Sequence, residues 1–215
     1  MDAEKSRWVK RFALAAATLG WAALAIQFWL TLSLSMARGK GLLGGLITYF
    51  SFFTILTNIL AATALTASPV RGGPGVAGFF SRPTVQTGIA ASIAVVGIAY
   101  SLLLQHLWDP KGLQLVADVV LHHVMPVLFL VYWWVAVRKA ELRVANIPLW
   151  TLYPIVYFLF AMLRGALSGA YPYPFIDARQ LGYPQALANA AGILLGFVAV
   201  ALLLVASGRR KDAAT

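Results

Sequence analysis

Two pairs of polar side chains, each set in a long apolar stretch, offer chemistry in this sequence. Thr54 and Asn58 are four residues apart in one stretch, and Asp118 and His122 are four apart in another. Residues at this spacing lie on one face of a helix. An imidazole beside a hydroxyl activates that hydroxyl for attack on an ester, and a carboxylate orients the imidazole. The pattern therefore indicates Thr54 as a nucleophile and His122 as its general base.

The polar residues around Thr54 have two interpretations. Thr48, Ser51, Thr54 and Asn58 are spaced by three, three and four residues, which predicts one polar helical face. In a catalytic site, Asn58 would lie one turn below the nucleophile and donate to the oxyanion. In a structural role, the same face would pack against a neighbouring helix, because Ser and Thr form hydrogen bonds between membrane helices. Both interpretations stay open.

The second pair leaves alternatives as well. His123 points about 100° away from His122 around the helix, so His122 is the favoured base, but the choice between them stays open. Counting about 1.5 Å per residue from the predicted helix ends places Asp118 and Arg164 at similar depths, about 6–7 Å. Asp118 therefore pairs either with His122 or with Arg164. Arg164 is also a candidate to hold the carboxylate of a fatty-acid substrate in a bidentate manner. The same count places Thr54 at about 16 Å and His122 at about 14 Å, so that they can meet.

The composition decides where these residues must lie. Hydrophobic residues make up 60 % of the 215 residues and charged residues only 11 %, whereas a soluble domain is about 25 % charged. So few charges cannot cover a water-facing surface, and so high a hydrophobicity excludes a disordered chain. The absence of cysteine from the sequence excludes disulfides, thiolate metal sites and cysteine nucleophiles.

Six apolar segments are long enough for a membrane-spanning helix, which needs about 20 residues. They predict an all-α integral membrane protein, a bundle of six transmembrane helices in a single domain over residues 1–215. The first segment is too long for a signal peptide and is expected to remain as a helix. The predicted spans are residues 12–36, 43–66, 84–106, 113–137, 148–168 and 185–207.

The positive charges predict the orientation of this bundle. Cytoplasmic loops carry an excess of Lys and Arg, and twelve of the 17 Lys and Arg residues fall on one side of the predicted spans. Both termini are therefore expected in the cytoplasm, and the bundle is expected in a bacterial inner membrane. The net charge of +10 then reflects topology and anionic lipid rather than nucleic acid. The twelve are Lys5, Arg7, Lys10, Arg11, Arg71, Arg82, Arg138, Lys139, Arg143, Arg209, Arg210 and Lys211; the opposite loops hold Arg38, Lys40, Lys111 and Arg179.

Other chemistries fit the sequence less well. The segment around Ser168 does not match the G-x-S-x-G motif of serine hydrolases, and no histidine follows it. His106 lies at the outer end of the third span, well above His122, which disfavours a bis-histidine haem. One aspartate with two diverging histidines does not make a metal-ligand set. We therefore expect neither a cofactor nor a metal.

Four short motifs occur in order along the sequence: Phe52-Phe-Thr-Ile-Leu-Thr-Asn58, Leu121-His-His-Val-Met-Pro126, Arg164-Gly165 and Tyr171-Pro-Tyr-Pro-Phe175. Together they resemble the bacterial branch of the androgen-induced-gene, FAR-17a-like family of multipass membrane proteins. Eukaryotic members of that family are threonine hydrolases that cleave fatty acid esters of hydroxy fatty acids. The resemblance implies that Thr54 is the nucleophile and His122 the base, although the His-His pair leaves the register of the histidine open.

The leading hypothesis is thus an intramembrane lipid-ester hydrolase with a Thr nucleophile and a His base, acting on a membrane lipid or a lipid-like ester. Two alternatives come from other classes. In a small transporter or lipid-binding protein, the Arg and Asp would line a path and a histidine would shuttle a proton. A haem or quinone electron carrier is less favoured.

Overall fold

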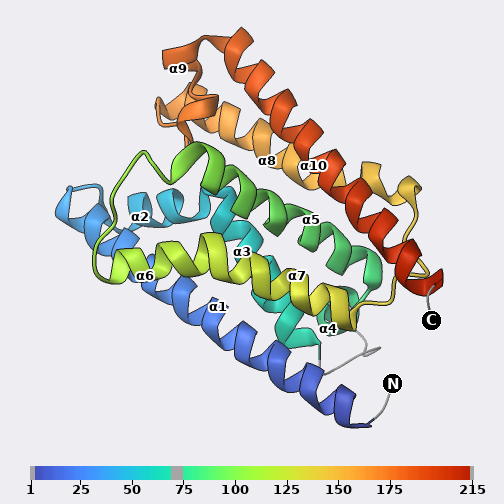
Figure 1. The fold of residues 1–215 in the computed structure, drawn as a ribbon. Coiled ribbons are helices and arrows are strands. Elements are labelled where there is room, and N and C mark those ends of the chain that lie inside the picture. The colour runs from blue at the N-terminus through green and yellow to red at the C-terminus, as the bar shows by residue number, and fades with distance from the viewer. Residues whose placement is uncertain (1–2, 69–74, 214–215) are drawn as a thin grey trace. The chain divides into compact units, whose positions relative to one another are not determined.

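The computed structural model describes residues 3–68 and 75–213, and all the regular structure in this part of the chain is helical. Five of its helices are long and apolar enough to cross a membrane, and a sixth crossing is possible if one bent helix pair counts as a span. The predicted all-α membrane fold is therefore confirmed (Figure 1). Arg71 lies outside the described residues, as do the side chains of Lys5, Arg209, Arg210 and Lys211.

The chain forms two compact units, residues 1–141 and residues 142–215. The organisation of the whole chain as a single domain stays a prediction. Unit 1 contains both of the polar pairs found in the sequence, and unit 2 contains Arg164.

In unit 1, the long helix α1 packs against α2, α3, α6 and α7, and α5 packs between α3 and α7. Figure 1 shows α1 running beside α6 and α7 over most of their length. The elements are α1 (Ala3–Ala37), α2 (Gly41–Phe50), α3 (Phe53–Ala67), α4 (Gly75–Phe80), α5 (Pro83–Ala99), η1 (Tyr100–Leu104), α6 (Leu113–Val119), η2 (Val120–Val124) and α7 (Met125–Ala136).

The second predicted span, residues 43–66, is not one straight helix. It consists of α2 and α3, which meet at an angle of 72°. Ser51 donates its hydroxyl to the Ile47 carbonyl, and Phe52 has an extended backbone at φ −93° and ψ 128°. A serine bonded back to its own helix often bends that helix, and one extended residue interrupts the hydrogen-bond ladder.

This bend corrects two expectations from the sequence. Thr48 is in α2 and Ser51 is its C-cap, whereas Thr54 and Asn58 belong to α3. These four residues therefore do not form one continuous helical face. The depth of Thr54 was counted along one straight helix, and that assumption does not hold, because Thr54 is the second residue of α3, after the bend.

Small residues let the helices of unit 1 approach closely. A Cβ on Gly97 in α5 would lie 3.2 Å from the His122 carbonyl oxygen and 3.2 Å from Pro126 Cβ. A Cβ on Gly20 in α1 would lie 2.7 Å from Met125 Cε. Such close packing of small residues is the usual way in which membrane helices associate, and here it brings α5 directly against η2.

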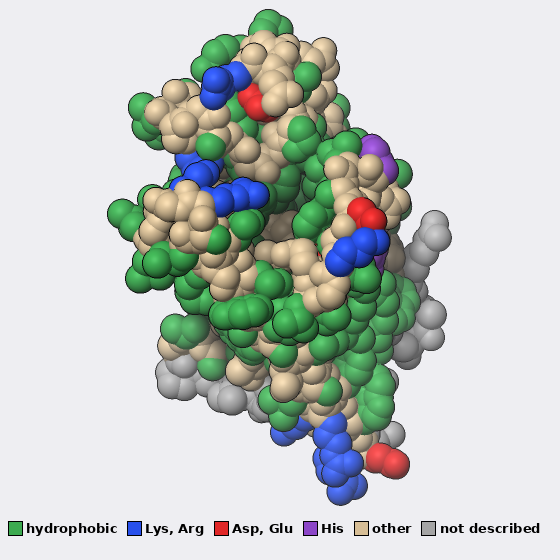
Figure 2. Space-filling view, turned by 90° about the vertical axis from the view of Figure 1, so that its left-hand side faces the viewer, with side chains coloured by type: hydrophobic (Ala, Val, Ile, Leu, Met, Phe, Trp, Pro, Cys, Tyr) green, Lys and Arg blue, Asp and Glu red, His purple; other side chains and the backbone are tan. Residues whose placement is uncertain are grey.

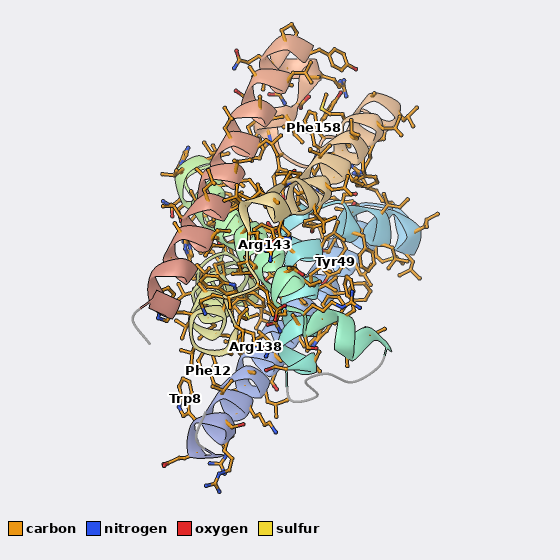
Figure 3. The ribbon with its side chains drawn as sticks, turned by 90° about the vertical axis from the view of Figure 1, so that its right-hand side faces the viewer. Trp8, Phe12, Tyr49, Arg138, Arg143 and Phe158 are labelled. Atoms are coloured by element: carbon orange, nitrogen blue, oxygen red, sulfur yellow. The ribbon has the colours of Figure 1, made fainter. Side chains whose placement is uncertain are left out.

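Large apolar side chains lie exposed along the helices, and Figure 2 shows hydrophobic side chains over most of the visible face. Lys and Arg appear there only in a few separate groups. A bilayer accepts such a surface, whereas water does not. Trp8 and Phe12 stack near the N-terminal end of α1, with ring centroids 5.3 Å apart (Figure 3), as is common for aromatic side chains at a membrane interface.

Lys139 is an exception among the basic residues that predicted the topology, because it is only 3 % exposed. Its Nζ donates to the carbonyls of Trp133, Trp134 and Val137 at 2.7–3.0 Å. These carbonyls lie at the C-terminal end of α7, where the Trp133 carbonyl also accepts the backbone N–H of Val137. Lys139 therefore caps α7, as basic residues do at helix C-termini.

In unit 2, the helices α8 and α10 pack side by side (Figure 1). α8 ends at Gly169, whose φ of 70° is the left-handed conformation that glycine adopts without strain. The elements of unit 2 are η3 (Val144–Asn146), α8 (Ile147–Ser168), η4 (Pro174–Ile176), α9 (Ala178–Leu181) and α10 (Tyr183–Ala213).

Candidate functional site

Tyr100, Asp118 and His122 form a compact polar cluster inside unit 1. The Tyr100 hydroxyl donates to Asp118 Oδ2, and the Tyr100 ring stacks on the His122 imidazole with centroids 3.9 Å apart and an interplanar angle of 16°. His122 Nδ1 lies 2.9 Å from the Asp118 carbonyl oxygen and 3.1 Å from Asp118 Oδ1. The side chains of Asp118 and His122 are only 4 % and 16 % exposed. The predicted i, i+4 contact between Asp118 and His122 is therefore present.

The cluster is built on two π-helical turns. Tyr100 begins η1, where Gln105 N donates to the Tyr100 carbonyl, and His122 lies in η2, where Met125 N donates to the Val120 carbonyl. Pro126 favours the second turn, because it has no N–H to give to the residue four positions earlier. Single π turns inside α-helices occur often at functional sites.

The contacts of His122 assign its tautomer. A carbonyl oxygen can only accept, so Nδ1 carries the hydrogen that it shares with the Asp118 carbonyl. One hydrogen cannot also bond well to Asp118 Oδ1, which has no hydrogen-bond partner among the residues described. In the neutral ring, Nε2 then keeps its lone pair and is the atom that can accept a proton.

Asn58 connects α3 to this cluster. Its Nδ2 donates to the Thr54 carbonyl at 2.9 Å and to the Leu121 carbonyl at 3.1 Å. Both amide hydrogens are therefore in use, and none is left for an oxyanion, so the expected oxyanion role does not fit this geometry. Asn58 is fully buried, and its Oδ1 has no hydrogen-bond partner in the described part of the chain.

Thr54 is buried, at 8 % exposure, one helical turn before Asn58 on α3. Because Asn58 contacts the carbonyl of Leu121, the α3 segment that carries Thr54 lies close to the segment that carries His122. The polar contacts of the His122 ring described above are with Asp118. A Thr54–His122 dyad stays a prediction, and such contacts often tighten only when substrate binds.

The other histidines occupy different surroundings. His123 is half-buried and meets the edge of the Tyr100 ring, with centroids 5.3 Å apart and an angle of 78°. His106 is exposed in the turn after η1. Within residues 3–68 and 75–213, no group of three or more His, Cys, Asp or Glu side chains is placed to hold a metal ion.

Arg164 is half-buried in unit 2, where its Nη1 donates to the Ala170 carbonyl. Its Nε is buried and has no hydrogen-bond partner in the described residues. Asp118 is bonded within unit 1 to Tyr100 and lies beside His122. An Asp118–Arg164 ion pair, which would join the two units, stays a prediction.

Tyr100 is the member of the cluster that the sequence did not reveal. The sequence did contain a signal that Tyr100 and Asp118 lie at the same depth. Tyr100 lies four residues before the end of η1, and Asp118 lies five residues after the start of α6. At about 1.5 Å per residue, both are about 6–8 Å from the same end of adjacent helices.

Comparison of the chain with protein-family models, with curated proteins and with solved structures gives no match. The resemblance to the androgen-induced-gene, FAR-17a-like family therefore stays a prediction carried by the four short motifs.

Proposed function

We propose that the chain is an intramembrane lipid-ester hydrolase with Thr54 as the nucleophile and His122 as the general base. The observation that supports this most is the buried cluster of Tyr100, Asp118 and His122. The cluster holds an imidazole through Nδ1 and leaves Nε2 to accept a proton. Asn58 joins the helix of the nucleophile to the residue that precedes the base.

The proposed reaction has two halves. Nε2 of His122 removes the proton of Thr54 Oγ1 while that oxygen bonds to the acyl carbon. The ester C–O bond then breaks, and the imidazolium gives its proton to the leaving alcohol oxygen. A water deprotonated by the same Nε2 attacks the acyl-threonine, the bond from the acyl carbon to Oγ1 breaks, and Thr54 regains the proton. Asp118 stabilises the imidazolium in both halves.

The proposed substrate is a long-chain fatty-acyl ester that enters from the lipid. Fatty acid esters of hydroxy fatty acids are the specific candidates, because the family resemblance implies them. The burial of the cluster supports an apolar substrate, since a site with so little exposure has limited contact with water.

The test is hydrolysis of a panel of long-chain acyl esters by the purified full chain. Thr54→Ala should lower turnover at least about 1,000-fold, because it removes the covalent route, and Thr54→Ser should retain part of it. Thr57→Ala is the matched control, because Thr57 is a fully buried threonine on the same helix. Full turnover in Thr54→Ala, or no cleavage of any ester by the wild type, would contradict the proposal.

We further propose that the chain lies in a bacterial inner membrane with both termini in the cytoplasm. The support is the distribution of Lys and Arg, acting through the positive-inside rule. A reporter fused after Thr215 should be active only in the cytoplasm. Activity only on the outer face would overturn this orientation.

A proton-coupled transporter is the second candidate, and two observations favour it. The bent pair α2 and α3 is a broken helix, as found at the substrate sites of many transporters. Asp118 Oδ1 and Asn58 Oδ1 are buried acceptors without hydrogen-bond partners among the described residues, and polar groups inside a membrane often mark proton paths. Proton uptake into proteoliposomes that is lost in Asp118→Asn but kept in Thr54→Ala would favour this candidate.

A further inference from the structure

Unit 2 contains a second polar centre, in the segment that joins α8 to α10. Two arginines converge there on adjacent carbonyls: Arg164 Nη1 donates to the Ala170 carbonyl, and Arg179 Nη1 donates to the Gly169 carbonyl at 2.9 Å. The two guanidinium groups are therefore held at one dipeptide, although fifteen residues separate them in the sequence.

Two glycines make this arrangement possible. A Cβ on Gly169 would collide with Arg179 Nη1, and a Cβ on Gly165 would overlap the ring of Tyr171. Gly169 also adopts the left-handed φ of 70° that ends α8. Gly169 thus leaves room for the Arg179 guanidinium group, and Gly165 leaves room for the Tyr171 ring.

Among the described residues at this centre, the two arginines are accompanied by one carboxylate, Asp177. Asp177 accepts from Arg179 N at 3.0 Å and from Gln180 Nε2 at 3.0 Å, both of which are uncharged donors. In the described residues of unit 2, neither Arg164 nor Arg179 forms an ion pair with a carboxylate. Two arginines against one aspartate leave a local excess of positive charge.

Hydrogen-bond donors are left over as well. A guanidinium group has five N–H donors, and Arg164 and Arg179 each give one to a carbonyl. Arg164 Nε is buried with no acceptor in the described chain, and a buried donor without a partner is costly. Arg179 is exposed, so the centre is accessible from outside. An oxyanion would supply the missing acceptors, and Arg binds carboxylate and phosphate in a bidentate manner.

The location indicates where that oxyanion comes from. The centre lies between the ends of two apolar helices, Val144–Ser168 and Tyr183–Gly208, which are each long enough to span a membrane. The connecting segment carries Tyr171, Tyr173 and Phe175, and the rings of Tyr173 and Phe175 stack with centroids 5.1 Å apart. Aromatic side chains at helix ends are typical of the headgroup level of a bilayer.

We propose that Arg164 and Arg179 form a binding site for the oxyanion of an anionic lipid, either a headgroup phosphate or the carboxylate of a fatty acid. The acyl chains of this lipid lie along the exposed apolar side chains of α8 and α10, such as Leu163, Leu167 and Leu187. The site does not depend on the ester-hydrolase proposal, since it lies in unit 2 and includes neither the nucleophile Thr54 nor the cluster of Tyr100, Asp118 and His122.

The test is direct binding to the purified full chain in neutral detergent, measured by native mass spectrometry. The probes are dioleoyl phosphatidate, oleate, dioleoyl phosphatidylcholine and inorganic phosphate. Phosphatidate or oleate should bind with a stoichiometry of one, and phosphatidylcholine and inorganic phosphate should bind much more weakly. A preference for phosphatidate identifies a headgroup phosphate as the ligand, and a preference for oleate identifies a fatty-acid carboxylate. Binding of inorganic phosphate as tight as that of the lipids would overturn the assignment to a lipid.

Variants link this binding to the two arginines. Arg164→Gln and Arg179→Gln should each weaken binding about ten-fold or more, because each removes charge-assisted hydrogen bonds. Arg164→Lys should keep the charge but lose the bidentate contact. Arg38→Gln in unit 1 is the control, because Arg38 is an exposed arginine in another loop, and it should leave binding unchanged.

The outcomes separate a site from general attraction between charges. Equal binding by the wild type and both Gln variants would overturn the proposal, as would an equal loss in Arg38→Gln. If Arg164→Gln does not fold, Arg179→Gln decides the question alone, because the Arg179 side chain is exposed.

Discussion

Replacing Tyr100 by Phe removes one hydroxyl group from the centre of the buried cluster. Tyr100 is 5 % exposed, and its hydroxyl donates to Asp118 Oδ2. Asp118 Oδ1 has no hydrogen-bond partner in the described residues, so the variant leaves the carboxylate with little besides the neighbouring imidazole. A hydrogen bond to a charged group contributes about 1.5–3 kcal/mol, and the free energy of unfolding should fall by that amount.

The effect on catalysis follows from the same bond. In the proposed mechanism, Tyr100 is a positioning residue that holds Asp118, which in turn orients His122. A loss of 1.36 kcal/mol in the transition state is a tenfold loss in rate. If the full free energy of this hydrogen bond contributes to stabilising the transition state, kcat should fall roughly 10- to 150-fold. KM should change little, because Tyr100 has no assigned contact with substrate, and the limb of the pH–rate profile that reports the base should shift.

Tyr49→Phe is the matched control for this experiment. Tyr49 is 4 % exposed in unit 1, and its hydroxyl donates to the Leu24 carbonyl at 2.9 Å. This acceptor is neutral, so the expected loss of stability is only about 0.6 kcal/mol, with unchanged kcat. Unfolding in mixed micelles and ester hydrolysis provide the two measurements. Wild-type turnover and an unshifted pH profile in Tyr100→Phe would refute the positioning role, even if stability falls.

Two further predictions concern the base and the packing of unit 2. His122→Ala should lower the rate of ester hydrolysis almost as much as Thr54→Ala does, because members of one catalytic unit act together. His123→Ala should keep most of the wild-type rate. The reverse order in steady-state assays would make His123 the base. Gly165→Ala should destabilise the protein by about 1–3 kcal/mol, because its Cβ would overlap the Tyr171 ring. Gly192→Ala, at a position with no atom within 4 Å of the added Cβ, should not lower the unfolding midpoint, and an equal drop in both variants would contradict this account.

The fold class could be predicted from composition and segment length alone, because a bilayer imposes both on any spanning helix. Five of the six predicted spans correspond to single long helices. The bend in the second span could not be predicted in this way. It depends on one serine that bonds back to its own helix and on one extended phenylalanine, in a stretch that has neither proline nor charge.

The candidate site was predictable only in part. The i, i+4 spacing placed Asp118 and His122 on one helical face, but it left Arg164 open as the alternative partner of Asp118. The role of Tyr100 did not follow from spacing, because it depends on which helices are neighbours and on how closely Gly97 lets α5 approach η2. The sequence also could not show that both Asn58 amide hydrogens form hydrogen bonds. One of their acceptors is the carbonyl of Leu121, which is sixty-three positions away in the sequence and lies nearby only because of the tertiary fold.

The two candidate functions make opposite demands on Asp118, and the geometry bears on the choice between them. A hydrolase needs a carboxylate that keeps its charge and its position while the imidazole exchanges protons. A proton-coupled transporter needs the same carboxylate to gain and lose a proton. The Tyr100 hydroxyl donates to Oδ2, and the His122 ring is held between the Tyr100 ring and the Asp118 carbonyl. These contacts restrain the carboxylate and the imidazole together, which favours the fixed role that the hydrolase requires.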